Sequence, residues 1–194
     1  MSVIRVFIAI ALPGMLQQKL DEAARLLKNE KTRAVRWVAG KNIHLTLKFL
    51  GEVESGKVDA ISQVIQAECR LIQPFEFSAG GAGAFPNLRR PRVVWIGVQA
   101  PPVLADLAAA IDRGTQALGF PGEDRAFSPH LTLGRVSQNA TPQEVQAVGQ
   151  ALSTARIGDL GSFTVTQVTL FRSDLQPGGA VYTPLFTAPL QKND

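Results

Sequence analysis

The sequence has 194 residues, of which 45% are hydrophobic, and this length suits one compact domain with a sizeable buried core. Its one cysteine, Cys69, excludes an internal disulfide and a cysteine-based metal site, and it fits a reducing compartment. The net charge of +4 favours anionic partners such as nucleic acids, and no apolar run is long enough to span a bilayer.

The first half of the chain predicts alternating strands and helices. Residues 3–12 are almost continuously apolar. We expect a buried strand there and not a secretion signal, because Arg5 interrupts the run and the preceding flank carries no other cationic side chain. A helical pattern at 16–27 and a turn at Ala39-Gly40 lead to the segment 44–47. A second helical pattern at 57–71 and a strand at 75–79 follow.

The second half repeats this order. A strand at 92–98, a helix at 103–118 and a turn at 119–122 lead to the segment 130–133. The sequence Thr141-Pro-Gln-Glu144 predicts a helix start, with Pro at the first helical position and Glu three residues after the cap. A strand at 162–171 follows. We expect surface loops in the Gly/Pro-rich segments 80–91 and 176–184, each ahead of a further strand, at 92–98 and 180–186.

The spacing between the two halves indicates a duplication. Positions 44 and 130 are 86 residues apart, and Phe75 and Phe163, which begin the later predicted strands, are 88 apart. We therefore expect two β-α-β-α-β units in a single bilobal α+β domain that spans residues 1–194. In the expected architecture, two antiparallel-rich sheets flank a central cleft and the helices lie on the outside.

The chemistry is concentrated in two copies of one tetrapeptide. The only histidines of the chain, His44 and His130, are each followed by Leu-Thr-Leu. Side chains alternate between the two faces of a strand, so His44 and Thr46 share one face, as do His130 and Thr132. The leucines then anchor the opposite face in the core. Two such strands would bring two imidazoles and two hydroxyls to a shared groove.

These residue types suit phosphoryl transfer. Imidazole titrates near neutral pH, so one histidine can take a proton from water while the other gives a proton to the leaving oxygen. Threonine hydroxyls can donate to the non-bridging phosphate oxygens, and the guanidinium of Arg135 suits phosphate recognition. Strict alternation would turn Arg135 toward the core, so we expect a β-bulge or the end of the strand at Gly134 to relieve this conflict. Phe49 holds the matching position after the first motif.

Other interpretations of these residues remain open. A lone histidine on a strand is more often structural than catalytic, but here the whole histidine supply lies in two identical motifs. A zinc site would need further ligands, and no third histidine or suitable cysteine exists, so we expect no metal and no other cofactor. Lys48 either joins the groove or is solvated. The cluster of Arg89, Arg90 and Arg92 fits a solvated loop edge as well as it fits RNA contact.

The paired motifs resemble those of the two-histidine (2H) phosphoesterase superfamily. The sequence is more closely similar to the RNA 2′,3′-cyclic phosphodiesterases, which are historically called 2′-5′ RNA ligases. The resemblance covers essentially the whole chain, from Arg5-Val-Phe-Ile-Ala-Ile through Lys48-Phe-Leu-Gly51 and Leu133-Gly-Arg135 to Tyr182. It implies a bilobal α+β fold and metal-independent hydrolysis of a 2′,3′-cyclic phosphate to a 2′-phosphate.

The resemblance also implies roles for individual residues. By position, His44 is the proton donor to the O3′ leaving group, and His130 is the proton acceptor that activates water. Thr46, Thr132 and Arg135 match the residues that hold the phosphate oxygens.

The remaining expectations concern the substrate and its partners. Phe49 and Tyr182 either stack on a base or pack in the core. The expected substrates are RNA or nucleotide 2′,3′-cyclic phosphate ends, with tRNA halves among them, for a cytoplasmic monomer without a membrane or an obligate protein partner. Three alternatives stay open: 2′-5′ RNA ligation as the reverse reaction, hydrolysis of a small cyclic nucleotide or ADP-ribose cyclic phosphate, and RNA or nucleotide binding without catalysis.

Overall fold

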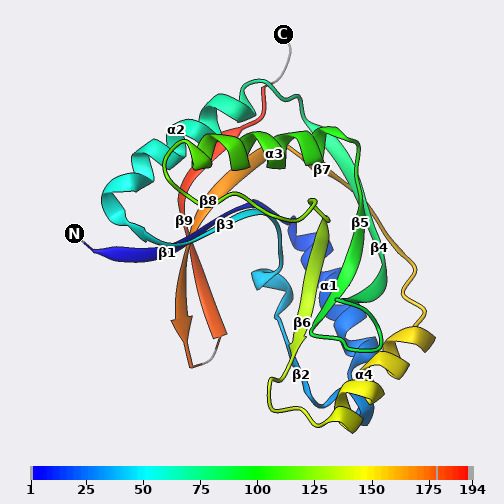
Figure 1. Cartoon of the computed structure of the whole chain (residues 1–194). Coiled ribbons are helices and arrows are strands. Elements are labelled where there is room, and N and C mark those ends of the chain that lie inside the picture. Colours follow the sequence, from blue (N-terminus) through cyan, green and yellow to red (C-terminus); the bar gives the residue numbers. More distant parts are fainter. Residues whose placement is uncertain (1, 178, 192–194) are drawn as a thin grey trace.

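The computed structural model describes residues 2–177 and 179–191, and in this part of the chain a nine-stranded antiparallel sheet curls into a half-barrel with four α-helices around it (Figure 1). The strands are β1 (Val3–Ala11), β2 (Val35–Trp37), β3 (His44–Glu54), β4 (Phe75–Phe85), β5 (Val93–Gln99), β6 (His130–Val136), β7 (Asp159–Val165), β8 (Gln167–Gln176) and β9 (Gly179–Pro189). The helices are α1 (Gly14–Leu27), α2 (Val58–Cys69), α3 (Val103–Gln116) and α4 (Pro142–Thr154).

All four predicted helices are present. The predicted start of α4 is confirmed, since the Thr141 hydroxyl accepts a hydrogen bond from the Glu144 amide and the Glu144 carboxylate accepts one from the Thr141 amide. Helices α2 and α3 lie side by side, with α2 against β8 and β9 and α3 against β3, whereas α4 lies against β4 (Figure 1). Within the described residues, no helix combines the length and apolarity needed to cross a membrane.

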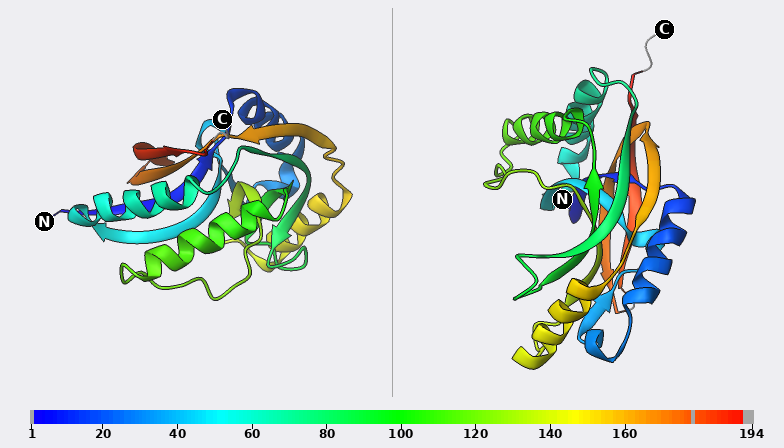
Figure 2. Two further views of the ribbon diagram at one scale, coloured as in Figure 1. Left: turned by 90° about the horizontal axis from the view of Figure 1, so that it is seen from above. Right: turned by 90° about the vertical axis from the view of Figure 1, so that its right-hand side faces the viewer.

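The sheet is continuous, which corrects the expected pair of sheets. Its strand order is β7-β4-β5-β6-β3-β1-β8-β9, and β2 pairs with β6 off this path. The two motif strands, β3 and β6, are central neighbours that pair at Leu45 and Leu131. Beyond this pair, β2 takes the place beside β6 and pairs with residues 134–136. Figure 2 shows how strongly the strands curve on either side of this junction.

The last strand of each predicted unit pairs with the first strand of the other. β4 lies beside β5, and β8 lies beside β1. The predicted strand at 162–171 is in fact two strands that separate at Thr166, with β7 at one edge of the sheet and β8 near the other. The predicted correspondence of Phe75 with Phe163 is not confirmed: the two residues lie on paired neighbours, β4 and β7, in which Phe77 lies opposite Phe163.

Both Gly/Pro-rich segments contain more strand than predicted. β4 continues through residues 80–85 and pairs with β5, and β9 begins at Gly179, inside the second expected loop. At Gly83 the ring of Trp95 packs directly on the backbone and leaves no room for a Cβ atom. Glycine serves close packing here, although the same composition in a sequence usually indicates a turn.

Candidate active site

The two His-Leu-Thr-Leu motifs lie side by side at the centre of the sheet. Leu45 pairs with Leu131, and both side chains are fully buried in the hydrophobic core. Because neighbouring residues alternate between faces, the histidine and threonine of each motif project from the opposite face. All four of these side chains are half-buried: His44, Thr46, His130 and Thr132.

The single pair Leu45–Leu131 fixes how the two motifs are aligned with each other. Continuing the antiparallel register from Leu45–Leu131 by one residue sets His44 opposite Thr132 and Thr46 opposite His130. Residues opposed in this way have Cβ atoms about 5 Å apart. The two imidazoles and two hydroxyls thus occupy one patch of the sheet, which we call the motif face.

A β-bulge in β6 returns Arg135 to the motif face. Trp95 of β5 pairs with Thr132 and Val94 pairs with Gly134, so Leu133 has no partner on β5. The extra residue shifts the alternation by one, and Arg135 then pairs with Val93, which shares a face with Trp95. Leu133 and Gly134 are consecutive buried residues, and Arg135 is exposed. Of the two expected solutions, a β-bulge or the end of the strand at Gly134, the structure has the bulge, and its unpaired residue is Leu133.

The first motif strand carries the same bulge 86 residues earlier. Ala9 of β1 pairs with Thr46 and Ile8 pairs with Lys48, so Leu47 is left without a partner on β1. Phe49 then lies on the motif face with 53% of its surface exposed. Lys48 turns the other way and is 2% exposed, so both predicted positions for it, in the groove or in solvent, are wrong.

Each imidazole is oriented by a carbonyl group two residues earlier in the chain. His44 Nδ1 lies 3.1 Å from the Asn42 carbonyl oxygen, and His130 Nδ1 lies 2.8 Å from the Ser128 carbonyl oxygen. A carbonyl oxygen can only accept, so Nδ1 carries the hydrogen in both rings. Nε2 is therefore the atom that accepts a proton in the neutral ring and donates one in the protonated ring.

Aromatic side chains surround the first imidazole. The ring of Phe7 stacks on His44 at 4.5 Å between centroids, and Tyr182 meets His44 edge-on at 5.1 Å. Phe7 also stacks on Phe171 at 5.3 Å and lies 5.9 Å from Phe49. Phe7 and Phe171 were not predicted as neighbours of the site, since apolar residues on strands usually indicate only core packing.

The charge state of the first imidazole follows from this enclosure. Burial lowers the pKa of His44 to about 4. The hydrogen bond to the Asn42 carbonyl opposes the shift, and the cation of Arg135 adds to it. Burial likewise raises the pKa of Tyr182, against the opposing cations of Arg135 and Arg5. The guanidinium of Arg135 is thus close enough to act on both His44 and Tyr182, across the junction of the two motif strands.

Fewer aromatic side chains surround the second imidazole, that of His130. Phe85 meets His130 edge-on at 4.8 Å and lies 5.3 Å from Trp95. Phe85 and Phe171 are 86 residues apart, as the two histidines are, and each ring lies on the sheet next to a motif imidazole. Searching the sequence for other aromatic pairs at that spacing would have found this one.

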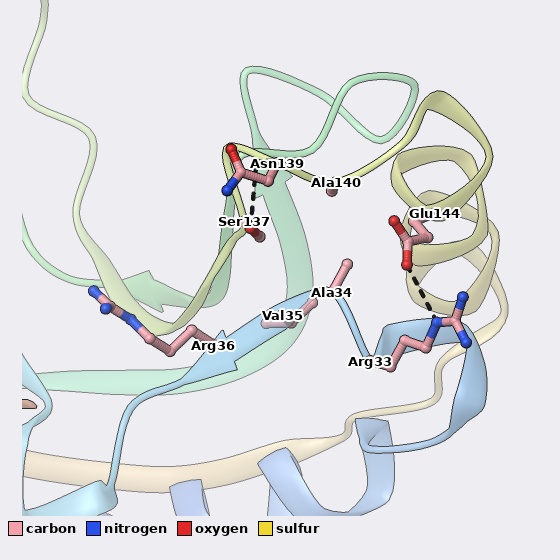
Figure 3. A pocket seen from close by; sticks show the side chains of 8 residues that line it. All are labelled: Arg33, Ala34, Val35, Arg36, Ser137, Asn139, Ala140 and Glu144. Atoms are coloured by element: carbon pink, nitrogen blue, oxygen red, sulfur yellow. Dashed lines mark hydrogen bonds and ion pairs between the residues drawn. The ribbon is translucent and has the colours of Figure 1, made fainter. Parts of the chain in front are cut away.

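The remaining predicted residues lie elsewhere on the molecule. Arg89 and Arg90 are exposed in the connection between β4 and β5, where their amides donate to the Asn87 side chain. A pocket of about 340 Å³ lies at the end of β2 beside α4, where Arg33 and Glu144 form an ion pair (Figure 3). In residues 2–177 and 179–191, no group of three or more His, Cys, Asp or Glu side chains is placed to hold a metal ion.

Comparison with known proteins identifies the family. A family model described as LigT-like phosphoesterase matches this chain twice in succession, over residues 10–95 and 96–182. The chain belongs to the LigT-like phosphoesterase family. The predicted assignment to the two-histidine phosphoesterases is therefore confirmed.

Relatives within the LigT-like family match almost end to end. The RNA 2′,3′-cyclic phosphodiesterase of Methanothermobacter thermautotrophicus is 37% identical over 182 residues, which are 94% of this chain and 96% of that protein. The Escherichia coli RNA 2′,3′-cyclic phosphodiesterase is 33% identical over 183 residues, or 93% of each chain. The crystal structure of E. coli LigT complexed with 3′-AMP matches with a TM-score of 0.76 at 31% identity, over 98% of this chain and all of that one.

Proposed function

We propose that this protein hydrolyses 2′,3′-cyclic phosphates at RNA ends to 2′-phosphomonoesters, with His44 and His130 as its acid/base pair. The observation that carries the proposal is the pair of half-buried imidazoles on one patch of the sheet, each held through Nδ1 so that Nε2 is available. The names of the relatives and the 3′-AMP complex of E. coli LigT support the choice of substrate.

The proposed reaction is an in-line displacement at phosphorus. His130 Nε2 takes a proton from a water molecule, whose oxygen forms a new bond to phosphorus. The bond from phosphorus to O3′ breaks, and His44 Nε2 gives its proton to O3′, which leaves a 3′-hydroxyl and a 2′-phosphate. Thr46 and Thr132 donate to the non-bridging oxygens, and Arg135 supplies positive charge to the phosphate.

The proton on His44 requires a source, because its lowered pKa keeps the ring neutral at pH 7 in the free protein. The cyclic phosphate is an anion, and an opposite charge within about 4–6 Å favours the charged form of an imidazole. The phosphate also offsets the cation of Arg135, which holds that pKa down. We propose that His44 gains its proton when the substrate binds.

The aromatic side of the motif face suits a nucleobase. Phe49 is half exposed next to Phe7, and Tyr182 stands edge-on to His44. Bases stack on such rings with little regard to sequence. We propose that Phe49 and Tyr182 contact the base of the nucleotide that carries the cyclic phosphate.

The test is incubation of the protein with a 2′,3′-cyclic phosphate oligonucleotide in EDTA, followed by identification of the position of the phosphate in the product. The expected product is a 2′-phosphate, formed at the same rate with and without EDTA. Tight binding without any product would instead indicate a nucleotide-binding protein. Net joining of 5′-hydroxyl and cyclic-phosphate ends at micromolar RNA would indicate that ligation is the favoured direction.

A further inference from the structure

We infer that Arg36 forms a second phosphate-binding position beside Arg135, which takes the 5′-phosphate of the nucleotide whose cyclic phosphate is opened. This inference rests on the proposed function and deepens it, because it assigns the residue that distinguishes an RNA end from a free nucleoside cyclic phosphate. It concerns a side chain outside both motifs.

The position of Arg36 follows from the pairing of β2 with β6. Arg36 lies directly opposite Arg135 in this antiparallel ladder. Opposed residues project from the same face of a sheet, so Arg36 joins the motif face to which the bulge has returned Arg135. Both side chains are exposed. Figure 3 shows the Arg36 side chain extending along β2, away from the ion pair of Arg33 with Glu144.

The two positive charges of Arg36 and Arg135 favour a bound anion. Like charges directly opposite each other on a sheet repel and destabilise the pairing of the strands. Among the described residues, neither Arg36 nor Arg135 forms an ion pair with a carboxylate. Arg33 and Arg172, which are also surface arginines, pair with Glu144 and Asp174. Two opposed guanidinium groups without acidic partners form a natural site for phosphate oxygens.

The two arginines serve different phosphates because they lie on different strands of the site, Arg135 on the motif strand β6 and Arg36 on its neighbour β2. Arg135 acts on both His44 and Tyr182, so its cation reaches over the place where the cyclic phosphate is opened. Arg36 lies on β2, which pairs with β6 at residues 134–136, beyond the point at which β3 pairs with Leu131. In an RNA chain, the next phosphate is attached to the 5′-oxygen of the same nucleoside. An RNA end therefore carries a second anionic group, this 5′-phosphate, next to the cyclic phosphate that reacts.

The test compares two substrates that differ by one group: a nucleoside 2′,3′-cyclic phosphate with a 5′-hydroxyl, and the same compound with a 5′-phosphate. We expect the wild-type protein to prefer the 5′-phosphorylated substrate by about tenfold or more in kcat/KM. In Arg36→Gln this preference disappears, while turnover of the 5′-hydroxyl compound stays within about twofold of wild type. The dependence of log kcat/KM on log salt for the 5′-phosphorylated compound should also become shallower by about 0.7, the value for one single-strand phosphate contact.

The matched control is Arg33→Gln, which removes an arginine three residues earlier that is paired with Glu144. It should keep the preference for the 5′-phosphate. Equal losses on both substrates in Arg36→Gln would show a merely structural role and overturn the inference, as would a wild-type protein that does not distinguish the two compounds.

A binding measurement separates failure of this inference from failure of the proposed function. Nucleoside 2′-monophosphate and 2′,5′-bisphosphate are titrated into the wild-type protein and Arg36→Gln. We expect the wild-type protein to bind the bisphosphate about tenfold more tightly than the 2′-monophosphate. Arg36→Gln should bind the two ligands with equal affinity. Both results are expected whether or not the protein turns over cyclic phosphates. Equal affinities in the wild-type protein would overturn the inference.

Discussion

Phe49 and Arg135 hold equivalent positions on the two motif strands, each two residues beyond a bulge and each on the motif face. The backbone has the same bulge in both motif strands, but the first strand carries an aromatic ring at this position and the second carries a guanidinium group. The two sides of the motif face therefore differ: aromatic rings surround His44, with Arg5 acting on Tyr182, and the opposed pair Arg135 and Arg36 lies at β6 and β2. If the proposed function holds, we expect this difference to give a nucleotide one preferred orientation, with its base on the rings and its phosphates on the opposed arginines.

Replacing Arg135 should weaken catalysis through the loss of charge-assisted bonds to phosphate. Hydrogen bonds to charged groups are worth about 1.5–3 kcal/mol, so Arg135→Gln should lower kcat/KM by about 10- to 100-fold. Arg135→Lys should recover part of this loss, because a lysine keeps the charge and lacks the planar fork. Steady-state kinetics on a cyclic phosphate oligonucleotide check both variants. A wild-type rate in Arg135→Gln would remove this residue from the site.

The two histidine roles can be separated by changing the leaving atom. On the natural substrate, His44→Ala and His130→Ala should each lower kcat by about 10²–10⁴-fold. When sulfur replaces O3′, the leaving group is a thiolate that needs little protonation, since a leaving group of lower pKa departs faster. His44→Ala should then approach the wild-type rate, whereas His130→Ala should stay impaired. Rescue of His130→Ala in place of His44→Ala would reverse the proposed assignment.

The rate should depend on pH in a way that reflects the burial of His44. A two-histidine pair gives a bell-shaped profile whose limbs belong to the pair as a whole. Because the pKa of His44 is about 4, the acid limb of kcat/KM should lie near pH 4, well below the range of an exposed imidazole. The acid limb of kcat should lie at higher pH, because the bound phosphate favours the imidazolium form. Coincident acid limbs would contradict protonation of His44 on substrate binding.

The sequence predicted the face of each motif side chain because strand alternation is a local property. Leu45 and Leu131 anchor the core as expected, and a bulge, one of the two solutions expected near Gly134, turns Arg135 back to the motif face. The matching bulge in β3 was not predicted, because its position is occupied by Lys48 and no glycine marks it. Lys48 therefore seemed to share a face with His44, although the structure turns it into the interior.

The sequence does not indicate which strands of the two halves pair with each other. An apolar strand can pair with any neighbour, so nothing local indicates that β4 joins β5 and β8 joins β1. The expected correspondence of Phe75 with Phe163 is not confirmed, whereas Phe85 and Phe171, at a spacing of 86, lie beside the two imidazoles. The aromatic enclosure of His44 is likewise a tertiary feature, assembled from β1, β8 and β9.

The burial of His44 should make folding stability depend on pH. The pKa of His44 is about 4 in the folded protein against 6.5 for an unperturbed imidazole, so the unfolded state binds the proton first as pH falls. The contribution of the neutral imidazole to the free energy of unfolding is fully present above pH 6.5. It falls by up to about 3 kcal/mol as the pH is lowered from about 6.5 to 4. Urea titrations of the wild-type protein and His44→Asn check this. The variant should lose less stability over the same range, and equal losses would contradict the buried, neutral imidazole.

Lys48 links the first motif strand to the segment that leads into the second motif. Its Nζ bonds to the carboxylate of Asp112 and, at 2.6 Å, to the carbonyl oxygen of Pro121. Asp112 in turn accepts a hydrogen bond from the Glu123 amide at 3.2 Å. The residues that follow, 124–129, are mostly exposed and include Ser128, whose carbonyl orients His130. We therefore predict that Lys48 is a positioning residue for His130.

Replacing Lys48 should therefore affect both stability and turnover. Removing one partner of a buried ion pair costs about 3–5 kcal/mol, and the partial exposure of Asp112 reduces this for Lys48→Met to about 2–3 kcal/mol. For a chain of this size, Tm should fall by about 5–10 °C. At temperatures where the variant is fully folded, kcat should still fall by about tenfold, because the segment that holds Ser128 is no longer tied to β3. Lys31→Met, at an exposed lysine, should change neither quantity. A destabilised Lys48→Met with the wild-type kcat would show that the pair supports the fold alone.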